Sequence, residues 1–390
     1  MKIVVAPQSF KGSLDAASVA EAIARGVRQV FPEADVLVLP VADGGEGTVR
    51  ALVRASGGRT VTTRVCGPLG RPVNATWGLL GDGRVAVIEM AAASGLPLIR
   101  RDQRNASVTT TFGTGELIRH ALDLDVRKLI VGIGGSATND GGVGMAQALG
   151  VRFLDSDDHE LPFGGAALAR LTRIDAHGLD ARLHNVEVEV ASDVNNPLYG
   201  AAGASHVYGP QKGAGAHMVR QLDAALEHYA HVLARDLGKD VGQEPGSGAA
   251  GGLGAGLLAF LNARLCPGVD IVFRAIDLNG NLKGAALVIT GEGRIDKQDI
   301  YGKAPMAVAQ AAARQGIPSI AIVGSSGRDY RVVYEHGLDA VIGTVNRPMA
   351  LDRAIAESAR LITEAAMRAC RLVRVGMAVQ RTAMDSDEPA

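Results

Sequence analysis

The sequence predicts an α/β protein with two domains, in which both chain ends build one parallel sheet and a second α/β domain is inserted between them. Short apolar runs alternate with helical stretches near both ends of the chain, which is the pattern of a parallel sheet. The middle of the chain differs, because alternating apolar and polar strands are followed there by glycine-rich loops. With 390 residues, the chain is also too long for one hydrophobic core of ordinary size.

The N-terminal segment reads as strand, helix, strand and helix. Residues 3–6 form an apolar run, and Ser13 is the expected N-cap of a helix whose apolar residues recur every three to four positions. Pro32 ends that helix, and residues 36–39 read as a second buried strand. A glycine-rich turn then leads into a helix that begins near Thr48.

The C-terminal segment continues the same alternation. An alanine-rich helix is expected over residues 304–315, and another over 351–372, with a disordered tail over 381–390. The expected strands are short apolar runs at residues 286–290, 319–323 and 340–342.

The inserted domain is expected to begin with strands that carry a different pattern. Residues 60–65 and 73–78 alternate, whereas residues 85–90 are apolar throughout. The predicted domains are therefore 1–62 with 285–390, and 63–284.

Composition excludes several classes of function. The formal net charge is −1, so no global field would hold nucleic acid or an anionic membrane surface. The three cysteines are scattered and form no CxxC pair, which argues against a disulfide framework or a zinc site. The first apolar run is too short for a signal peptide, and no run is long enough to span a membrane, so a cytoplasmic location is expected. A homo-oligomer is compatible with the sequence.

Glycine is unusually frequent, at 50 residues, and gathers in loops that are candidates for anion binding. In the loop at residues 132–142, between a predicted strand and a predicted helix, backbone NH groups and the hydroxyls of Ser136 or Thr138 are expected to face an anion. A purely structural turn remains open, and so does a dinucleotide fingerprint with Asp155 as its acidic residue. The phosphate loop GxxxxGK followed by Ser or Thr is absent, because Ala304 follows Lys303.

Two further glycine-rich loops are weaker candidates. Residues 245–256 permit the close approach either of a nucleotide or of a neighbouring helix. Residues 209–213 form a turn that carries Lys212, a cation that would meet a phosphate or a carboxylate, or would simply be solvated.

Polar side chains follow three predicted strands of the sheet that both chain ends share. Ligands of open α/β sheets gather outside the carboxyl ends of strands, so these side chains are expected to lie at one edge. They are Ser9 and Lys11, Asp43 and Glu46, and Glu292, Arg294 and Asp296.

Asp193 follows an alternating run in the inserted domain. Its carboxylate reads equally well as a general base, as a magnesium ligand or as the first residue of an Asx-turn before Pro197.

Taken together in order, these segments resemble the type I bacterial glycerate kinases, which phosphorylate the 2-hydroxyl of D-glycerate. The resemblance implies ATP and magnesium as cofactors, D-glycerate as substrate, and two α/β domains with the active cleft between them, one of them flavodoxin-like. It covers roughly residues 1–375, and the matching motifs lie at residues 6–14, 40–48, 88–95, 132–142, 192–198, 209–214, 245–254 and 289–296.

With this resemblance, the candidate residues take provisional roles. We expect Asp193 to orient the attacking hydroxyl, with Lys11 and Lys212 neutralising charge on the substrate or the transferred group. The metal ligands are expected among Asp43, Glu292 and Asp296. The residues expected to bind substrate or nucleotide are Ser9, Gly134, Gly135, Ser136, Thr138, Asn139, Asp140, Gly248, Gly251, Gly252 and Arg294.

Two departures and three alternatives accompany this hypothesis. The family commonly has Asp where this chain has Gln8, and often Thr where it has Asn195. The sequence alone does not separate 2- from 3-phosphorylation, so a glycerate 3-kinase is one alternative. A nicotinamide-dependent dehydrogenase and a non-catalytic sugar-acid-binding protein are the others.

Overall fold

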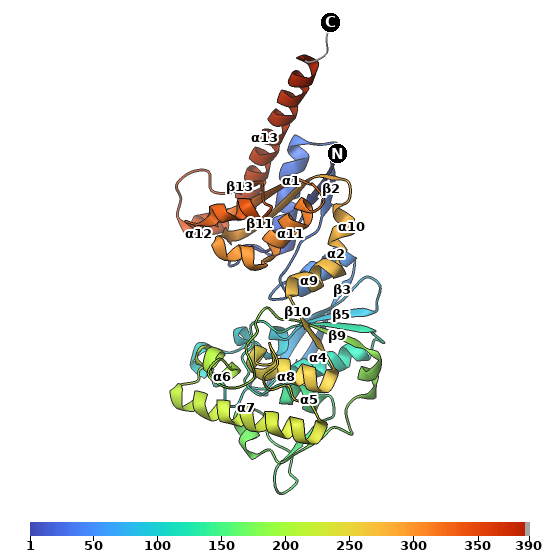
Figure 1. Cartoon of the computed structure of the whole chain (residues 1–390), viewed down its shortest axis with the longest axis vertical. Coiled ribbons are helices and arrows are strands. Elements are labelled where there is room, and N and C mark those ends of the chain that lie inside the picture. Colours follow the sequence, from blue (N-terminus) through green and yellow to red (C-terminus); the bar gives the residue numbers. More distant parts are fainter. Residues whose placement is uncertain (387–390) are drawn as a thin grey trace. The chain divides into compact units, whose positions relative to one another are not determined.

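The computed structural model describes residues 1–386, and the chain divides into two compact units. Unit 1 comprises Met1–Ala42 and Val272–Ala390, and unit 2 comprises Asp43–Ile271. Each unit has its own sheet with its own helices (Figure 1). Both boundaries of the inserted unit thus lie earlier in the chain than the 62/63 and 284/285 expected from the sequence.

The sheet of unit 1 is wholly parallel and combines both chain ends, as predicted. Its strand order is β13-β12-β11-β1-β2. Numbered along the chain within this unit, that order is the 2-1-3-4-5 of flavodoxin-like folds. The strands are β1 (Lys2–Val5), β2 (Asp35–Val38), β11 (Ala285–Ile295), β12 (Ser319–Ser326) and β13 (Ala340–Gly343).

Helices cover both faces of this sheet because successive strand residues point to opposite sides. Ile320 and Ile322 of β12 join the core beneath α1 and α13, whereas Ala321 and Val323 join the core beneath α11. The helices of this unit are α1 (Ala16–Val30), α10 (Leu278–Leu282), α11 (Ala304–Ala313), α12 (Leu351–Ala356) and α13 (Ser358–Ser386), and α9 (Gly268–Ala275) lies across the division between the units.

Three local expectations for unit 1 are corrected by the structure. Helix α1 is capped by Asp15 rather than Ser13, because the Asp15 carboxylate accepts a 2.8 Å hydrogen bond from the amide of Ser18. The expected helix over 351–372 is two helices, α12 and α13, and α13 continues to Ser386, so most of the expected tail is helical. Residues 387–390 of that tail lie outside the described part of the chain.

The third correction concerns the polar segment after residue 290. It was expected to be a loop, but β11 continues as a strand to Ile295. Its extra length pairs in parallel register with β12, where Glu292 lies opposite Val323 and Arg294 opposite Ser325.

Unit 2 contains a mixed sheet with the order β10-β9-β6-β5-β4-β3. Strands β3, β4 and β5 pair antiparallel, and β5, β6, β9 and β10 pair parallel. The strands are β3 (Arg59–Cys66), β4 (Pro72–Leu79), β5 (Val85–Glu89), β6 (Lys128–Gly132), β9 (Glu187–Ala191) and β10 (Arg264–Cys266), with a separate antiparallel pair of β7 (Arg152–Leu154) and β8 (Arg173–Asp175).

A continuous core of unit 2 includes the buried rings of Trp77, Phe153 and Tyr229. Helix α2 packs against β3, β4 and β5, which is why the chain joins this unit well before residue 63. The helices are α2 (Thr48–Ser56), α3 (Ala91–Ser94), α4 (Phe112–Leu122), α5 (Val143–Ala148), α6 (Ala204–Tyr208), α7 (Ala216–Leu237) and α8 (Ala249–Leu261).

Short 3₁₀ helices connect these elements. In order along the chain they are η1 (Leu96–Leu98), η2 (Arg101–Gln103), η3 (Gly165–Arg170), η4 (Ala181–Asn185), η5 (Pro210–Lys212), η6 (Lys297–Tyr301) and η7 (Tyr330–His336). Within residues 1–386, no helix combines the length and the apolar character that a membrane crossing requires.

The close contact between α1 and α13 predicts a cost for any side chain at Gly26. A Cβ atom there would lie 2.5 Å from the Thr363 carbonyl oxygen and 2.7 Å from the Ala366 Cβ. Gly26→Ala should therefore lower the free energy of unfolding by about 1–3 kcal/mol through overpacking, although alanine is the better helix former.

Gly376 provides the matched control, because a Cβ there meets nothing within 4 Å in the same helix pair. Gly376→Ala should raise the free energy of unfolding by up to about 1 kcal/mol, as measured by chemical denaturation. Equal effects of the two substitutions would contradict the packing argument.

Candidate functional site

In unit 1, charged side chains gather where β11 ends. Glu292 is 7% exposed, and its Oε1 atom is buried without a hydrogen-bond partner. The pKa of Glu292 is raised to about 8, chiefly by burial and next by the carboxylate of Asp299, while Lys303 opposes the rise. A buried carboxyl group with an unused oxygen fits either a proton or a cation as its partner.

Asp299 organises the turn that follows. Its carboxylate accepts a short hydrogen bond from the amide of Asp296, and the Asp296 carboxylate accepts a 2.9 Å bond from the amide of Gln298, which together form a capping box at η6. The other oxygen of Asp299 forms an ion pair with Lys303 at the start of α11. Asp299 is fully buried, so it fixes both the turn and the lysine.

Lys303 and Asp299 are charged groups that sequence reasoning missed. The Gly302-Lys303 pair was noticed only as an incomplete phosphate loop. The signal that could have found it is the four-residue spacing from Asp299 across a turn, which is a common spacing for ion pairs.

The loop after β1 lies alongside this cluster, as its position after a neighbouring strand predicted. The amide of Gln8 donates a 2.8 Å hydrogen bond to the carbonyl of Gly291, and Gly293 lies against the backbone of Lys11. Lys11 is close enough to influence the carboxyl group of Glu292. The structure thus brings Lys11, Glu292 and Asp296 together, with Arg294 exposed and 3.6 Å from the Asp296 carboxylate.

Gln8 is 6% exposed, and its backbone pairing to β11 does not depend on its side chain. A glutamine at this position therefore keeps the loop in place. It does so without adding a further carboxylate to the cluster.

In unit 2, Asp193 lies just beyond β9 and is exposed as a residue, although its carboxylate is partly desolvated. Its Oδ1 accepts a 3.0 Å hydrogen bond from the amide of Gly268. Burial raises its pKa, the Gly268 amide lowers it, and the carboxylates of Asp43 and Asp270 raise it. Asp43, which the sequence grouped with the polar loops of the first sheet, belongs to unit 2 and is a close electrostatic neighbour of Asp193.

The glycine-rich loop between β6 and α5 is built around the buried carboxylate of Asp140. One oxygen accepts 2.8 Å hydrogen bonds from both the amide and the hydroxyl of Thr111, and the amides of Gly142 and Gly144 approach the carboxylate at 3.3 Å. Burial raises the pKa of Asp140, and these hydrogen bonds lower it. Both carboxylate oxygens accept hydrogen bonds inside the protein, so Asp140 supports the loop.

The other predicted residues of this loop divide between its exposed tip and its buried base. Gly134 and Gly135 are exposed. Ser136 beside them is buried and forms an isolated antiparallel β-bridge with Gly95. Thr138 and Asn139 are fully buried. The Asn139 amide donates a 2.9 Å hydrogen bond to Ser205, while its oxygen has no partner in the described part of the chain.

Lys212 points into the protein rather than toward solvent. Its Nζ donates a 2.7 Å hydrogen bond to the carbonyl of Thr138, and the residue is 1% exposed. Burial lowers the pKa of Lys212 to about 7, and Asp140 opposes the fall. The catalytic role predicted for Lys212 stays a prediction, whereas its structural role is to attach the 209–213 turn to the first glycine-rich loop.

The loop at residues 245–256 interlocks with the first loop. Ala250, Gly251 and Gly252 have positive φ values of 55°, 71° and 88° at a kink inside α8. A Cβ at Gly251 would lie 1.9 Å from the Thr138 carbonyl, and its own carbonyl accepts a 3.0 Å hydrogen bond from Gly141. A Cβ at Gly248 would likewise lie 2.0 Å from the Pro197 carbonyl oxygen. These glycines are required for close contact between backbone segments.

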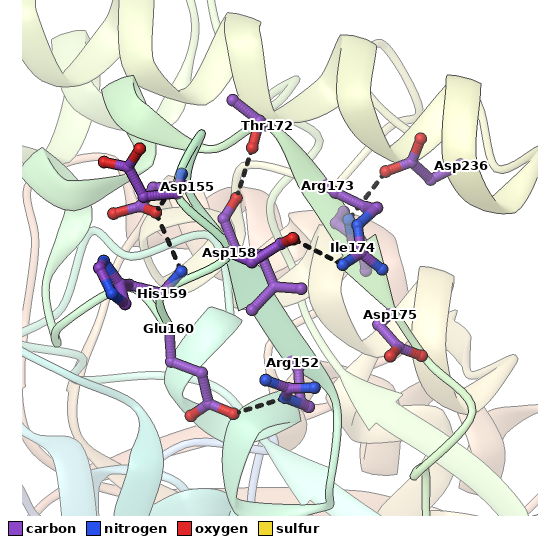
Figure 2. A network of polar contacts seen from close by, with 12 residues as sticks. Arg152, Asp155, Asp158, His159, Glu160, Thr172, Arg173, Ile174, Asp175 and Asp236 are labelled. Atoms are coloured by element: carbon purple, nitrogen blue, oxygen red, sulfur yellow. Dashed lines mark hydrogen bonds and ion pairs between the residues drawn. The ribbon is translucent and has the colours of Figure 1, made fainter.

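A group of potential metal ligands lies elsewhere in unit 2, in the turn after β7. Asp155, Asp157 and His159 offer ligand atoms within 4.8 Å of one another, which no other trio of such residues does within the described chain. Figure 2 shows Asp155 beside His159, with exposed ion pairs around them. The Asp155 carboxylate accepts a 3.0 Å hydrogen bond from the backbone amide of His159. The carboxylate of Asp155 also accepts a 3.0 Å hydrogen bond from the amide of Asp157, so it closes a surface turn.

Unit 1 thus carries paired lysines and carboxylates at the carboxyl edge of a flavodoxin-like sheet, and unit 2 carries a rigid glycine-rich loop with an exposed tip. These are the parts that a phosphotransferase without a Walker loop needs.

The comparisons with known proteins define the family. The glycerate kinase family matches this chain over residues 3–374. The chain is 54% identical to a glycerate kinase of Bacillus subtilis, over 94% of this chain and 96% of that protein. It is 50% identical to the glycerate 2-kinase of Escherichia coli, over 97% and 99% of the two chains.

A solved structure agrees. A crystal structure assigned to glycerate kinase 2 from Salmonella typhimurium LT2 has a TM-score of 0.89 and 51% identity, and the match covers 97% of this chain and 99% of that one. The chain belongs to the glycerate kinase family, and the family predicted from the sequence is confirmed.

The raised pKa of Glu292 predicts a specific pH dependence of stability. The folded chain keeps this proton up to about pH 8, whereas an ordinary glutamate releases it near 4.5. The contribution of Glu292 to stability is therefore complete below pH 4.5 and is lost as the pH rises to 8. The parent should therefore lose more unfolding free energy between pH 5 and pH 8 than the Glu292→Gln variant does. We expect a difference of about 1–3 kcal/mol between the two losses, measured by urea denaturation at both pH values.

Glu33 on the surface is the control, and Glu33→Gln should change the same difference by less than about 0.5 kcal/mol. If Glu292→Gln were no more stable at pH 8 than the parent, Glu292 would have to be ionised in the folded protein.

Proposed function

We propose that this chain transfers the γ-phosphoryl group of ATP to the 2-hydroxyl of D-glycerate, giving 2-phosphoglycerate and ADP. The observation that carries this proposal is the match to the glycerate 2-kinase of Escherichia coli along nearly the whole of both chains. The charged and glycine-rich segments described above supply the groups that phosphoryl transfer requires.

The tip of the first glycine-rich loop is the part of unit 2 best suited to phosphate. Gly134 and Gly135 are exposed there and have no side chains of their own to obstruct an approaching ligand. Because Asp140 and Lys212 hold the base of the loop from inside, the tip keeps its shape before ligand arrives. Such preorganised donors are effective at stabilising developing charge.

Magnesium is assigned to carboxylates, since oxygen ligands are those it prefers. In unit 1 the unpartnered Oε1 of Glu292 and the neighbouring Asp296 fit this role. A divalent cation would supply the charge that allows Glu292 to ionise despite its burial. In unit 2, Asp43 is the corresponding candidate.

Asp193 is assigned as the group that orients the glycerate hydroxyl and accepts its proton. The Gly268 amide fixes one of its oxygens, so the other is available to a substrate. Its raised pKa makes it a better proton acceptor than a fully solvated aspartate. Lys11 is assigned to neutralise charge on the transferred group or on the glycerate carboxylate.

The alternatives outside the kinases have no support. The acidic residue of the dinucleotide fingerprint, Asp155, is engaged in its own turn. Relatives over nearly the whole chain are named as kinases, and none of those cited is named as a dehydrogenase or a sensor. The cytoplasmic location stays a prediction from the sequence.

Replacement of the proposed base is the first test. Asp193→Asn should reduce kcat for glycerate-dependent ADP release by about 10²–10⁴-fold while leaving the fold intact, because the amide cannot accept the proton. Asp155→Asn, a change to a carboxylate outside the proposed site, should leave kcat within twofold. A kcat for Asp193→Asn within threefold of the parent would remove Asp193 from the mechanism.

The position of phosphorylation is tested separately. Phosphorus NMR of the product formed from D-glycerate and ATP should show the resonance of 2-phosphoglycerate, whose phosphate is attached to a secondary carbon. A 3-phosphoglycerate resonance would instead make the chain a 3-kinase, with the family assignment unaffected.

A further inference from the structure

Unit 2 contains a cavity of about 450 Å³ that none of the assigned roles uses. It is lined by Arg101 and Arg104 on one side and by Pro210, Gln211 and Gly213 on the other. The arginines come from η2 and the residue after it, and the facing wall is the η5 turn whose Lys212 is attached to the first glycine-rich loop. The cavity therefore adjoins the loop system to which phosphate binding is assigned.

Neither arginine of this cavity has an acidic partner within residues 1–386. The one nearby carboxylate, Asp102, is occupied by Arg100, which holds it through 2.6 and 3.1 Å hydrogen bonds. One terminal nitrogen of Arg104 donates a 3.2 Å hydrogen bond to the carbonyl of Gln211. Its Nε atom is buried and has no hydrogen-bond partner within the described residues. Buried guanidinium donors are ordinarily satisfied, so the Arg104 guanidinium, which helps to line the cavity, is incompletely paired within the described residues.

The geometry of the cavity wall is fixed by the backbone. Gly213 has a φ of +91°, and a Cβ there would lie 2.3 Å from the carbonyl oxygen of Arg104. Only glycine allows the turn to lie this close to Arg104. Because Lys212 is anchored inward, the turn cannot easily move away.

From these observations we propose that the cavity binds a small oxyanion, a carboxylate or a phosphate group, through Arg101 and Arg104. A planar guanidinium matches either anion with two parallel hydrogen bonds. Two such groups without a competing carboxylate favour an anion over a cation or an apolar ligand. Arg101 and Arg104 thus supply the positive charge that sequence reasoning had expected from Lys212 in the facing turn.

Two sources of this anion are relevant, and this part of the inference rests on the proposed function. The carboxylate of D-glycerate is one source, and a phosphate group of the nucleotide is the other. Both are tested with the full chain by titration calorimetry, using D-glycerate, ADP and inorganic phosphate as separate probes.

The test compares Arg104→Met and Arg101→Met with Arg100→Met. Arg100 lies on the same segment but is paired with Asp102 and does not line the cavity, so it controls for loss of a neighbouring charge. Loss of a charge-assisted hydrogen-bonding group should weaken binding of the anion by about ten- to a hundredfold. Arg100→Met should bind all three probes within twofold of the parent.

The pattern of losses identifies the anion. Weaker D-glycerate binding and a raised KM for glycerate alone assign the cavity to the substrate carboxylate. Weaker ADP binding and a raised KM for ATP alone assign it to the nucleotide. Weaker binding of inorganic phosphate alone identifies a site for a separate anion.

If the Arg101→Met variant and the Arg104→Met variant both bind all three probes within twofold of the parent, the proposal is overturned. Arg101 is exposed, so Arg101→Met should fold normally. It therefore still tests the proposal if Arg104→Met does not fold. Failure of the proposed function would appear differently, as no glycerate-dependent ADP release by the parent protein. The phosphate titration would still test the cavity in that case.

Discussion

The glycine-rich loops of unit 2 depend on a carboxylate that no solvent reaches. Asp140 binds four donors from Thr111 and from the first turn of α5, and so fixes the path of the chain between β6 and that helix. The ammonium of Lys212 lies in the field of this carboxylate and binds the neighbouring carbonyl of Thr138. The two ionisable groups thus lie close together in the interior, where a charge on either alone would be costly.

The consequences of this arrangement extend to three chain segments. The kink of α8 inserts Gly251 against Thr138, and the 209–213 turn is attached by Lys212, so neither loop is free to move independently. Removal of one charge would leave the other buried and uncompensated. The exposed amides of Gly134 and Gly135 inherit this rigidity, which is the property a phosphate-binding loop needs.

Unit 1 solves a different electrostatic problem. Its carboxyl group at Glu292 is desolvated without a complete set of partners, and so retains a proton until another positive charge arrives. Asp299 is equally buried, but it is compensated by Lys303 and by a backbone amide. Compensated groups hold the turn in place, and the uncompensated group is the one available to a ligand.

What the sequence determined by itself was local. The apolar runs placed the strands of unit 1, and the polar residues after β1 and β11 were correctly expected to meet, because side-chain alternation and parallel topology follow from the chain itself. The length of β11 was missed, since Glu292 and Arg294 look like loop residues until β12 provides hydrogen-bond partners for their backbone. Ser13 was expected to cap the first helix, but Asp15, also a good capping residue, caps it, and only the backbone geometry selects between them.

Tertiary structure decided which charges are buried and which are available. Lys212 points inward because Thr138, 74 residues earlier, offers it a carbonyl, and no local pattern contains that information. Arg104 went unnoticed because its significance lies in having no carboxylate partner among residues 1–386, which only the folded chain reveals. The pairing of a buried charge depends on segments far apart in sequence, whereas the strand-and-helix pattern depends on neighbours, and this is why the fold was predictable and the roles of the charged residues were not.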